Sequence, residues 1–408
     1  ATPLLIGMAI GAYGLTQAVL QIPFGMLSDR IGRKPVIIFG LVLFAAGGLL
    51  AAGADSIQQV IAGRILQGAG AIAAAVMALV ADSTREQHRT KAMAMIGMSI
   101  GLAFAVAMVA GPVVAGIAGL GGVFLSTSML AIVGIGLVLL VVPTPQQVLL
   151  HRDAGIVRGA LRPALANSEL LRLNYGIACL HAILMATFLA IPLALQQQAG
   201  LPKEEHWWVY LAALLLSFFG MVPFIIYAER QRQMKRVLLG AVALLVLVQP
   251  LFWLTQASLP WLVACIILFF VGFNLLEATL PSLLSKIAPA GGKGTAMGVY
   301  STSQFAGAAL GGMFGGWLFA HFGLGGGFVG CALSGLAIGV TMSETPYVTS
   351  YRLAVSSDRI RDAGLAASLL AVAGVTDVVI VADESAAYLK VDSKLLDREA
   401  LDRVAAPV

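Results

Sequence analysis

Charge is scarce in this chain of 408 residues. Asp, Glu, Lys and Arg together make up only 11% of it, whereas 59% of the residues are hydrophobic. A soluble domain usually carries about 25% charged residues, so the composition excludes an ordinary soluble protein. The net charge of +5 could suggest nucleic-acid binding. Basic loops between membrane spans explain it better, and we expect no nucleic-acid partner.

Cysteine is also rare. The three cysteines, Cys179, Cys265 and Cys331, all lie inside apolar runs. Their spacing matches neither a metal site nor a disulfide framework. No catalytic nucleophile, metal-binding cluster or phosphate-binding loop can be recognised in the sequence. We therefore expect no metal, no cofactor and no enzymatic activity.

Long apolar runs dominate what is present. Each is long enough to cross a bilayer, which takes about 20 mostly apolar residues. The sequence predicts an all-α polytopic membrane protein up to about residue 343. We place eleven spans at roughly 3–27, 36–54, 57–81, 91–118, 122–142, 172–198, 207–228, 236–255, 260–285, 294–320 and 326–343.

Basic residues lie almost entirely in every second loop. The opposite loops carry only Lys203. Because loops rich in Lys and Arg stay in the cytoplasm, we expect these loops and the C-terminus to be cytoplasmic. The basic loops contain Arg30, Arg33, Lys34, Arg85, Arg89, Lys91, Arg152, Arg158, Arg162, Arg172, Arg230, Arg232, Lys235, Arg236, Lys286 and Lys293.

An internal repeat relates two halves of the chain. A shift of 204 residues places Gly68 on Gly272 and Gly111 on Gly315, and such repeats are typical of transporters. The span at 172–198 has no counterpart in the first half. We therefore expect the first of twelve helices to be missing, with an authentic eleven-helix protein as the alternative. The predicted units are an N-terminal bundle at 1–145, a cytoplasmic linker at 146–171 and a C-terminal bundle at 172–343.

Residues 346–408 form a more polar segment that predicts a separate cytoplasmic domain. We expect a strand at 350–355, a helix capped by Asp358, a hairpin of 376–382 with 386–392, and a helix at 396–404. The order β-α-β-β-α predicts a small α+β ferredoxin-like domain whose last strand is missing or unformed. It contains no cysteine, which argues against metal delivery.

A glycine-rich charged loop joins the first two spans. Gly25-Met26-Leu27-Ser28-Asp29-Arg30-Ile31-Gly32-Arg33-Lys34 resembles the G-x-L-x-D-R-x-G-R-R/K signature of the major facilitator superfamily. An acid among basic residues can be paired or released, so we interpret the loop as a conformational latch. Asp82, at the end of the third span, is expected to join Asp29 and Arg33. The alternative is a solvated surface cluster of little energy.

Two further stretches are similar to motifs of this superfamily. Arg64 and Gln67 belong to a stretch that resembles R-x-x-Q-G-x-G, and an arginine within a span usually has a function. The alternative is that Arg64 extends along the helix to the outer surface. A second set resembles G-x-x-x-G-P-x-x-G-G, associated with drug:proton antiporters. The match is partial, and ordinary close helix packing is its rival. This set comprises Gly101, Ala107, Gly111, Pro112 and Gly116.

Polar residues inside the second half are candidates for proton coupling. Glu277 is the one acid placed well inside a span, and Asn274 lies one turn before it. A buried carboxyl can exchange a proton with a cavity. A neutral Glu277 that bonds a neighbouring helix is equally compatible with the sequence. His181 could also titrate, although a single histidine on a helix is more often a packing residue.

The resemblance implies a twelve-helix major facilitator fold. The C-terminal domain and the segment 293–305 are similar to one group of bacterial inner-membrane members. This implies a proton-coupled efflux antiporter of small molecules or drugs, working by alternating access in the lipid bilayer. The alternatives are an importer or facilitator on the same fold, or a membrane sensor regulated through the C-terminal domain. That domain could bind a ligand or a second copy of itself.

Overall fold

A computed structural model describes most of the chain. The described residues are 2–84, 86–143, 158–231, 233–289, 292–341, 349–356, 359–362, 364–382, 385–392 and 395–405. Within them, nine helical segments are long and apolar enough to cross a membrane. The expected linker residues 146–157, the boundary near 343–346 and the expected cap Asp358 lie outside the described part.

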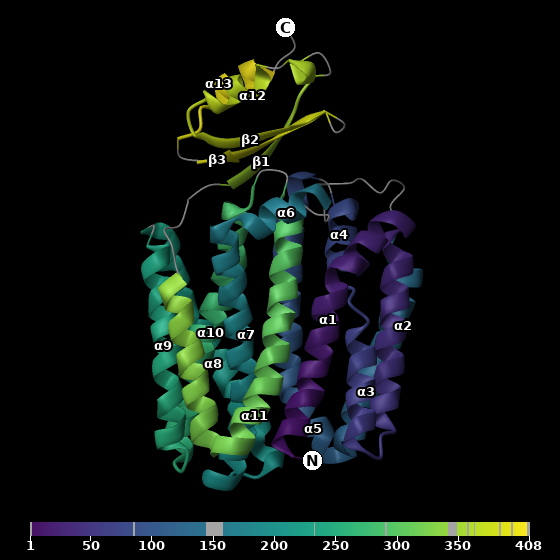
Figure 1. Cartoon of the computed structure of the whole chain (residues 1–408), viewed down its shortest axis with the longest axis vertical. Helices are drawn as coiled ribbons and strands as arrows, with labels where there is room; N and C mark the ends of the chain where they lie inside the picture. The colour runs from purple at the N-terminus through teal and green to yellow at the C-terminus, as the bar shows by residue number, and fades with distance from the viewer. Residues whose placement is uncertain are drawn as a thin grey trace.

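The helical body follows the predicted spans closely (Figure 1). A short helix, α6, lies in the expected linker, and a π-helical turn at Ala194–Gln198 extends α7. The helices are α1 Pro3–Ile31, α2 Arg33–Ala52, α3 Ile57–Gly68, α4 Ala73–Ser83, α5 Glu86–Leu140, α6 Arg158–Ala166, α7 Ser168–Leu193, α8 His206–Arg230, α9 Met234–Thr255, α10 Leu259–Ile287 and α11 Lys293–Thr341.

Two of these helices each contain two predicted spans. The chain breaks helical geometry inside α5 at Gly119, with φ 67°, and inside α11 at Gly323, with φ 65°. A positive φ of this size favours glycine, which has no Cβ to clash. The two glycines are 204 positions apart, the offset of the sequence repeat. The same backbone break therefore recurs in both halves and supports the predicted repeat.

The predicted span 57–81 is confirmed as a candidate membrane span at Ile57–Val80, but its helix is not continuous, and one predicted loop was wrong. The predicted span 57–81 is interrupted between α3 and α4, where Gly70 lies so close to the carbonyl of Gly40 on α2 that a side chain would not fit. The predicted loop 28–35 is mostly helical, because α1 continues to Ile31 and α2 starts at Arg33. Gly32 alone, with φ 98°, makes the turn between them.

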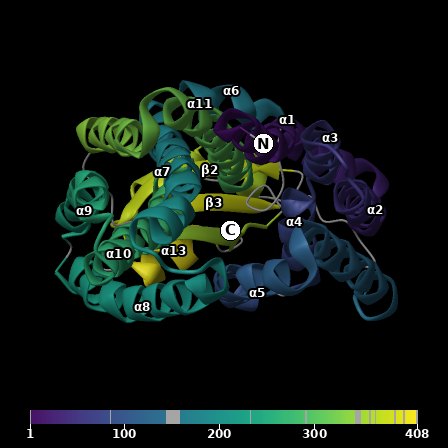
Figure 2. The ribbon, with the colours of Figure 1, turned by 90° about the horizontal axis from the view of Figure 1, so that it is seen from below.

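The two halves meet along two lines. α1 packs against α11, and α5 lies beside α8 (Figure 2). Close contact needs small residues on both helices: a Cβ on Gly14 of α1 would lie 2.8 Å from the carbonyl oxygen of Phe305 on α11. The main apolar core lies among α6–α11, and a smaller core around Val36 and Ile37 holds the first half.

The C-terminal domain has the predicted order of elements. Its strands form an antiparallel sheet in the order β1-β3-β2, the arrangement of a split β-α-β unit. Its helices cover one face of the sheet. The first helix starts later than expected, at Leu365, after a single 3-10 turn at Arg359–Arg361. The elements are β1 Thr349–Ala354, α12 Leu365–Leu370, β2 Val375–Val381, β3 Ala386–Val391 and α13 Arg398–Ala405.

The second face of this sheet is turned toward the helical body (Figure 1). Along β3, Ala387 and Leu389 pack under the domain's own helices, whereas Tyr388 and Lys390 lie on the opposite face and are only 2% and 3% exposed. Lys390 Nζ donates a hydrogen bond to the carbonyl oxygen of Ser285, 2.6 Å away, in the last turn of α10. The domain is thus docked on the helical body.

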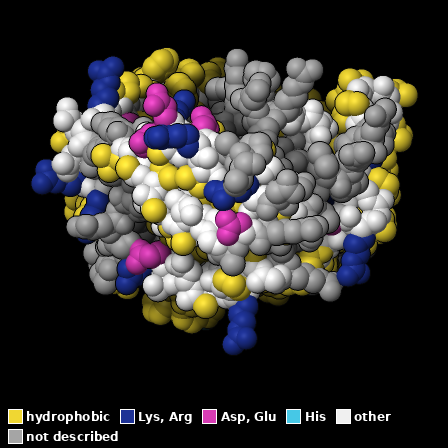
Figure 3. Space-filling view, turned by 90° about the horizontal axis from the view of Figure 1, so that it is seen from above, with side chains coloured by type: hydrophobic (Ala, Val, Ile, Leu, Met, Phe, Trp, Pro, Cys, Tyr) yellow, Lys and Arg dark blue, Asp and Glu magenta, His cyan; other side chains and the backbone are white. Residues whose placement is uncertain are grey.

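The end of the molecule that carries this domain also carries basic side chains around its rim (Figure 3). Arg30 at the end of α1 is exposed there, and Lys286 at the end of α10 forms an ion pair with Glu229 of α8 at 3.5 Å. Arg30 and Lys286, which belong to two of the basic loops identified in the sequence, therefore lie at the same end of the helical body (Figure 1).

Candidate functional site

The expected latch residues form a compact network at the α1–α2 turn. Arg33 donates through Nη1 to Ser28 Oγ at 2.8 Å and to Asp29 Oδ1, and through Nε to Asp82 Oδ2 at 2.9 Å. Its side chain is 3% exposed, so the cation is buried but has two anionic partners. Arg33 thus ties α1, α2 and α4 of the same half together.

The other residues of this stretch have different environments. Gly25 is buried within α1, and Gly32 makes the turn. Arg30 is exposed and Lys34 is half-buried. The structure therefore brings Asp29, Arg33 and Asp82 together. Of the three basic residues predicted around Asp29, Arg33 is the one that is buried in this network.

Arg64 lies between α3 and α1. Its guanidinium stands 4.3 Å above the ring of Tyr13, donates through Nε to the carbonyl oxygen of Ala9 at 3.4 Å, and donates through Nη1 to Gln67 Oε1 at 2.9 Å. Gln67 in turn donates to Thr127 of α5 at 3.5 Å. Because Tyr13 and Ala9 lie on α1, the Arg64 side chain points toward the neighbouring helix α1 rather than along its own helix to the outer surface.

The small-residue stretch of α5 has an open face. No described atom lies within 4 Å of the place where a Cβ would stand on Gly101, Gly111 or Gly116. The repeat-related Gly315 of α11, by contrast, packs on Ala186 of α7, where a Cβ would come within 2.7 Å. At these three positions α5 thus lacks the close helix contact that Gly315 makes.

Three helices of the second half bring a polar cluster together. Glu277 of α10 accepts a hydrogen bond at Oε1 from Gln304 Nε2 of α11, at 3.2 Å. The same Gln304 nitrogen lies 2.8 Å from His181 Nε2 of α7. His181 Nε2 and Glu277 Oε2 are 3.8 Å apart. The two candidates for proton coupling are therefore neighbours, and Gln304 connects them.

The carboxyl of Glu277 has two different oxygens. Oε1 accepts from Gln304, whereas Oε2 is enclosed and has no hydrogen-bond partner among the described residues. The side chain as a whole is 38% exposed. The exposed part of the side chain is therefore not Oε2, which faces His181 at 3.8 Å.

Asn274 does not join this cluster. Its amide donates to Ser217 of α8 at 3.0 Å, one helical turn away from Glu277. Gln304 was not among the predicted site residues, because an uncharged glutamine within a small-residue helix gives no titration signal. Only the packing of α7, α10 and α11 identifies it.

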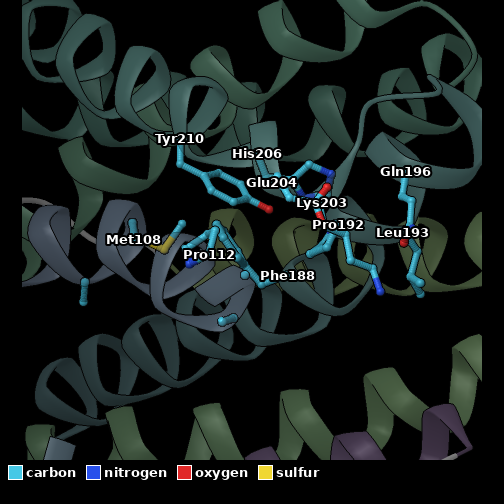
Figure 4. A pocket seen from close by; sticks show the side chains of 13 residues that line it. Met108, Pro112, Phe188, Pro192, Leu193, Gln196, Lys203, Glu204, His206 and Tyr210 are labelled. Carbon is cyan, nitrogen blue, oxygen red and sulfur yellow. The ribbon is translucent and has the colours of Figure 1, made fainter. Parts of the chain in front are cut away.

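A cavity of about 490 Å³ lies between the halves (Figure 4). One wall comes from α5 and includes Ala107, Pro112 and Gly116. The other comes from α7 and the start of α8 and includes Phe188 and Tyr210. Lys203, Glu204, His206 and Gln196 add polar groups to its lining. Three residues of the predicted small-residue motif therefore line a cavity of the size usual for small-molecule sites.

Comparison with known proteins places both parts of the chain. Residues 1–312 match the family model described as Major Facilitator Superfamily, and residues 351–406 match the YajR YAM domain. The chain is 52% identical over 401 residues to the inner membrane transport protein YajR of Escherichia coli K12, covering 98% of this chain and 88% of that protein.

More distant similarities are consistent with these matches. The multidrug resistance protein MdtH of Aeromonas salmonicida is 27% identical over 322 residues, covering 76% of each chain. Among solved structures, a D-xylose-proton symporter superposes with a TM-score of 0.65 at 17% identity, over 84% of this chain and 88% of that one. This likeness shows the fold, and the resemblance inferred from the sequence motifs is confirmed.

Proposed function

This chain belongs to the major facilitator superfamily, and we propose that it is a proton-coupled transporter that exports small molecules by alternating access. It is an inner-membrane transport protein by its similarity to the E. coli relative. The cluster of Glu277, Gln304 and His181 carries the proposal. It places a carboxyl and an imidazole side by side on helices that an alternating-access cycle would move.

The cavity supports a small-molecule substrate. Both halves contribute to its walls, and most of its lining is apolar. Pockets of this kind bind drug-sized ligands. One charge that crosses about 100 mV releases ~2.3 kcal/mol, enough for roughly a 40-fold solute gradient. A single proton per cycle is therefore sufficient to drive useful export.

We place the basic loops and the C-terminal domain in the cytoplasm, following the distribution of Lys and Arg. We also propose that the C-terminal domain regulates transport. The bond from Lys390 to Ser285 supports this, because it connects the domain to α10, the helix that carries Glu277. Deletion of residues 346–408 should leave an inserted protein with an altered rate. Loss of folding on deletion, at matched expression, would show a structural role instead.

Everted membrane vesicles provide the test of export. The vesicles are energised so that their lumen becomes acidic. Lipophilic cations, anions and neutral compounds are then added in turn while a fluorescent dye reports the internal pH. An exported substrate should release protons from wild-type vesicles and not from vesicles carrying Glu277→Gln. If every compound that binds moves without any movement of protons, the proposal is contradicted. If a compound instead enters right-side-out vesicles together with protons, the protein is an importer.

A further inference from the structure

One side-chain amide serves two partners at the centre of the proposed proton site. Gln304 Nε2 lies 3.2 Å from Glu277 Oε1 and 2.8 Å from His181 Nε2. An amide nitrogen carries two hydrogens, so it can donate to both partners at once. The carboxylate oxygen only accepts, which fixes the first of these bonds as a donation from Gln304.

The second bond fixes the form of the histidine. His181 Nδ1 lies 3.3 Å from the carbonyl oxygen of Ile177. A carbonyl only accepts, so Nδ1 carries the hydrogen and Nε2 of the neutral ring is the acceptor. Both bonds can form at once when His181 is neutral, and the bond to Glu277 is strongest when that carboxyl is ionised.

The helices that carry these three residues, α7, α10 and α11, do not pack equally tightly against one another. α7 and α11 pack together along their length, with Gly307 and Gly311 of α11 placed directly on the backbone of Ala178 and Ala182 of α7. α10 meets these two helices far less. A side chain on α11 that bonds a residue of α10 therefore clasps α10 to a firmly joined pair.

We propose that Gln304 is a positioning residue that clasps α10 to the α7–α11 pair while Glu277 is ionised, and releases it when the site takes up a proton. The proposal rests on the proposed function, in which Glu277 and His181 form the proton site. A protonated His181 Nε2 would be a donor and could no longer accept from the amide. A protonated Glu277 would bind the amide more weakly, because the bond would lose its charge assistance.

The other titratable and charged groups near Glu277, His181 and Gln304 have the following partners and positions. On α11, Tyr300 lies one turn away and interacts electrostatically with Glu277. On α1, which packs against α11, Tyr13 is engaged by Gln17 and Arg64. α8 faces this part of α10 with the neutral Ser217, and its Glu229 pairs with Lys286 nine residues beyond Glu277, about 13 Å along the helix. α9 meets α10 with apolar residues such as Leu245 near Gly272.

The first measurement is an infrared pH titration of the full chain in lipid nanodiscs. The carboxyl band of Glu277 is assigned by its loss in Glu277→Gln. Gln304→Leu keeps the size of the side chain and removes both bonds. It should raise the midpoint of the band by about one pH unit, because a hydrogen bond to the charged form is lost.

The second measurement is hydrogen–deuterium exchange of α10, below and above that midpoint. Above it, Gln304→Leu should exchange faster than wild type. Below it, where the clasp is already released, the two should exchange alike. A purely structural role for Gln304 would instead raise the exchange of α10 equally at both pH values, and this result would overturn the proposal.

Gln249→Leu is the matched control. Gln249 is a fully buried glutamine of α9 in the same bundle and bonds Thr187. Its replacement should lower thermal stability without moving the midpoint. If the Glu277 band titrates but Gln304→Leu does not move its midpoint, the role proposed for Gln304 is refuted and the proton site stands. If no band is lost in Glu277→Gln, the proton site of the proposed function fails as well.

Discussion

Repeat-related glycines give the sharpest test of how the helices pack. Gly315 of α11 faces α7, and a Cβ there would lie 2.7 Å from Cβ and 2.8 Å from Cα of Ala186. Carbon atoms prefer a separation of about 3.5–4.0 Å, so Gly315→Ala must push α7 away by ~1 Å. Gly111→Ala, at the related position of α5, meets no described atom within 4 Å.

The magnitudes separate the two variants. Overpacking costs about 1–3 kcal/mol, and the better helix propensity of alanine returns about 1 kcal/mol. Gly315→Ala should therefore lose about 1 kcal/mol, or roughly 2–4 °C in Tm for a unit of this size. Gly111→Ala should gain up to about 1 kcal/mol from propensity alone.

The assay is heat treatment of the detergent-solubilised protein followed by size-exclusion chromatography with fluorescence detection. Each variant is compared with wild type prepared in parallel. Equal losses in Gly111→Ala and Gly315→Ala would refute the reasoning, because they would mean that the face of α5 is covered as tightly as that of α11.

Three further predictions concern charged residues. Asp82→Asn should lower the free energy of unfolding by about 3 kcal/mol and Asp29→Asn by about 1 kcal/mol. The reason is that Arg33 is buried and that the Asp82 side chain is 1% exposed, against 12% for Asp29. Equal losses of Tm in the two variants would contradict this. Glu277→Gln should abolish proton-driven transport at normal expression, and an unchanged pH dependence of transport would rule out its role. Lys390→Met should keep the aliphatic packing and loosen the C-terminal domain, seen as faster proteolysis between the domain and α11, whereas wild-type proteolysis would show that the bond to α10 is dispensable.

The sequence predicted most of the helical architecture because membrane spans depend on local composition. A run of apolar residues is visible without any knowledge of its partners. It could not show that α3 and α4 are separate, because that break depends on how closely Gly70 approaches Gly40 of another helix. Nor did it show that α1 continues to Ile31, because the single residue Gly32 makes the turn to α2.

The candidate site divides in the same way. Charge in an apolar span identified Glu277, His181 and Arg64 from the sequence alone, because an ionisable group is costly there and needs a reason. The contact of Gln304 with His181 and the bond of Lys390 to α10 join residues more than a hundred positions apart in the chain. Hydrogen bonds act over about 3 Å. Composition and motifs thus determined the family, the spans and the ionisable candidates, while only tertiary packing decided which of these side chains meet.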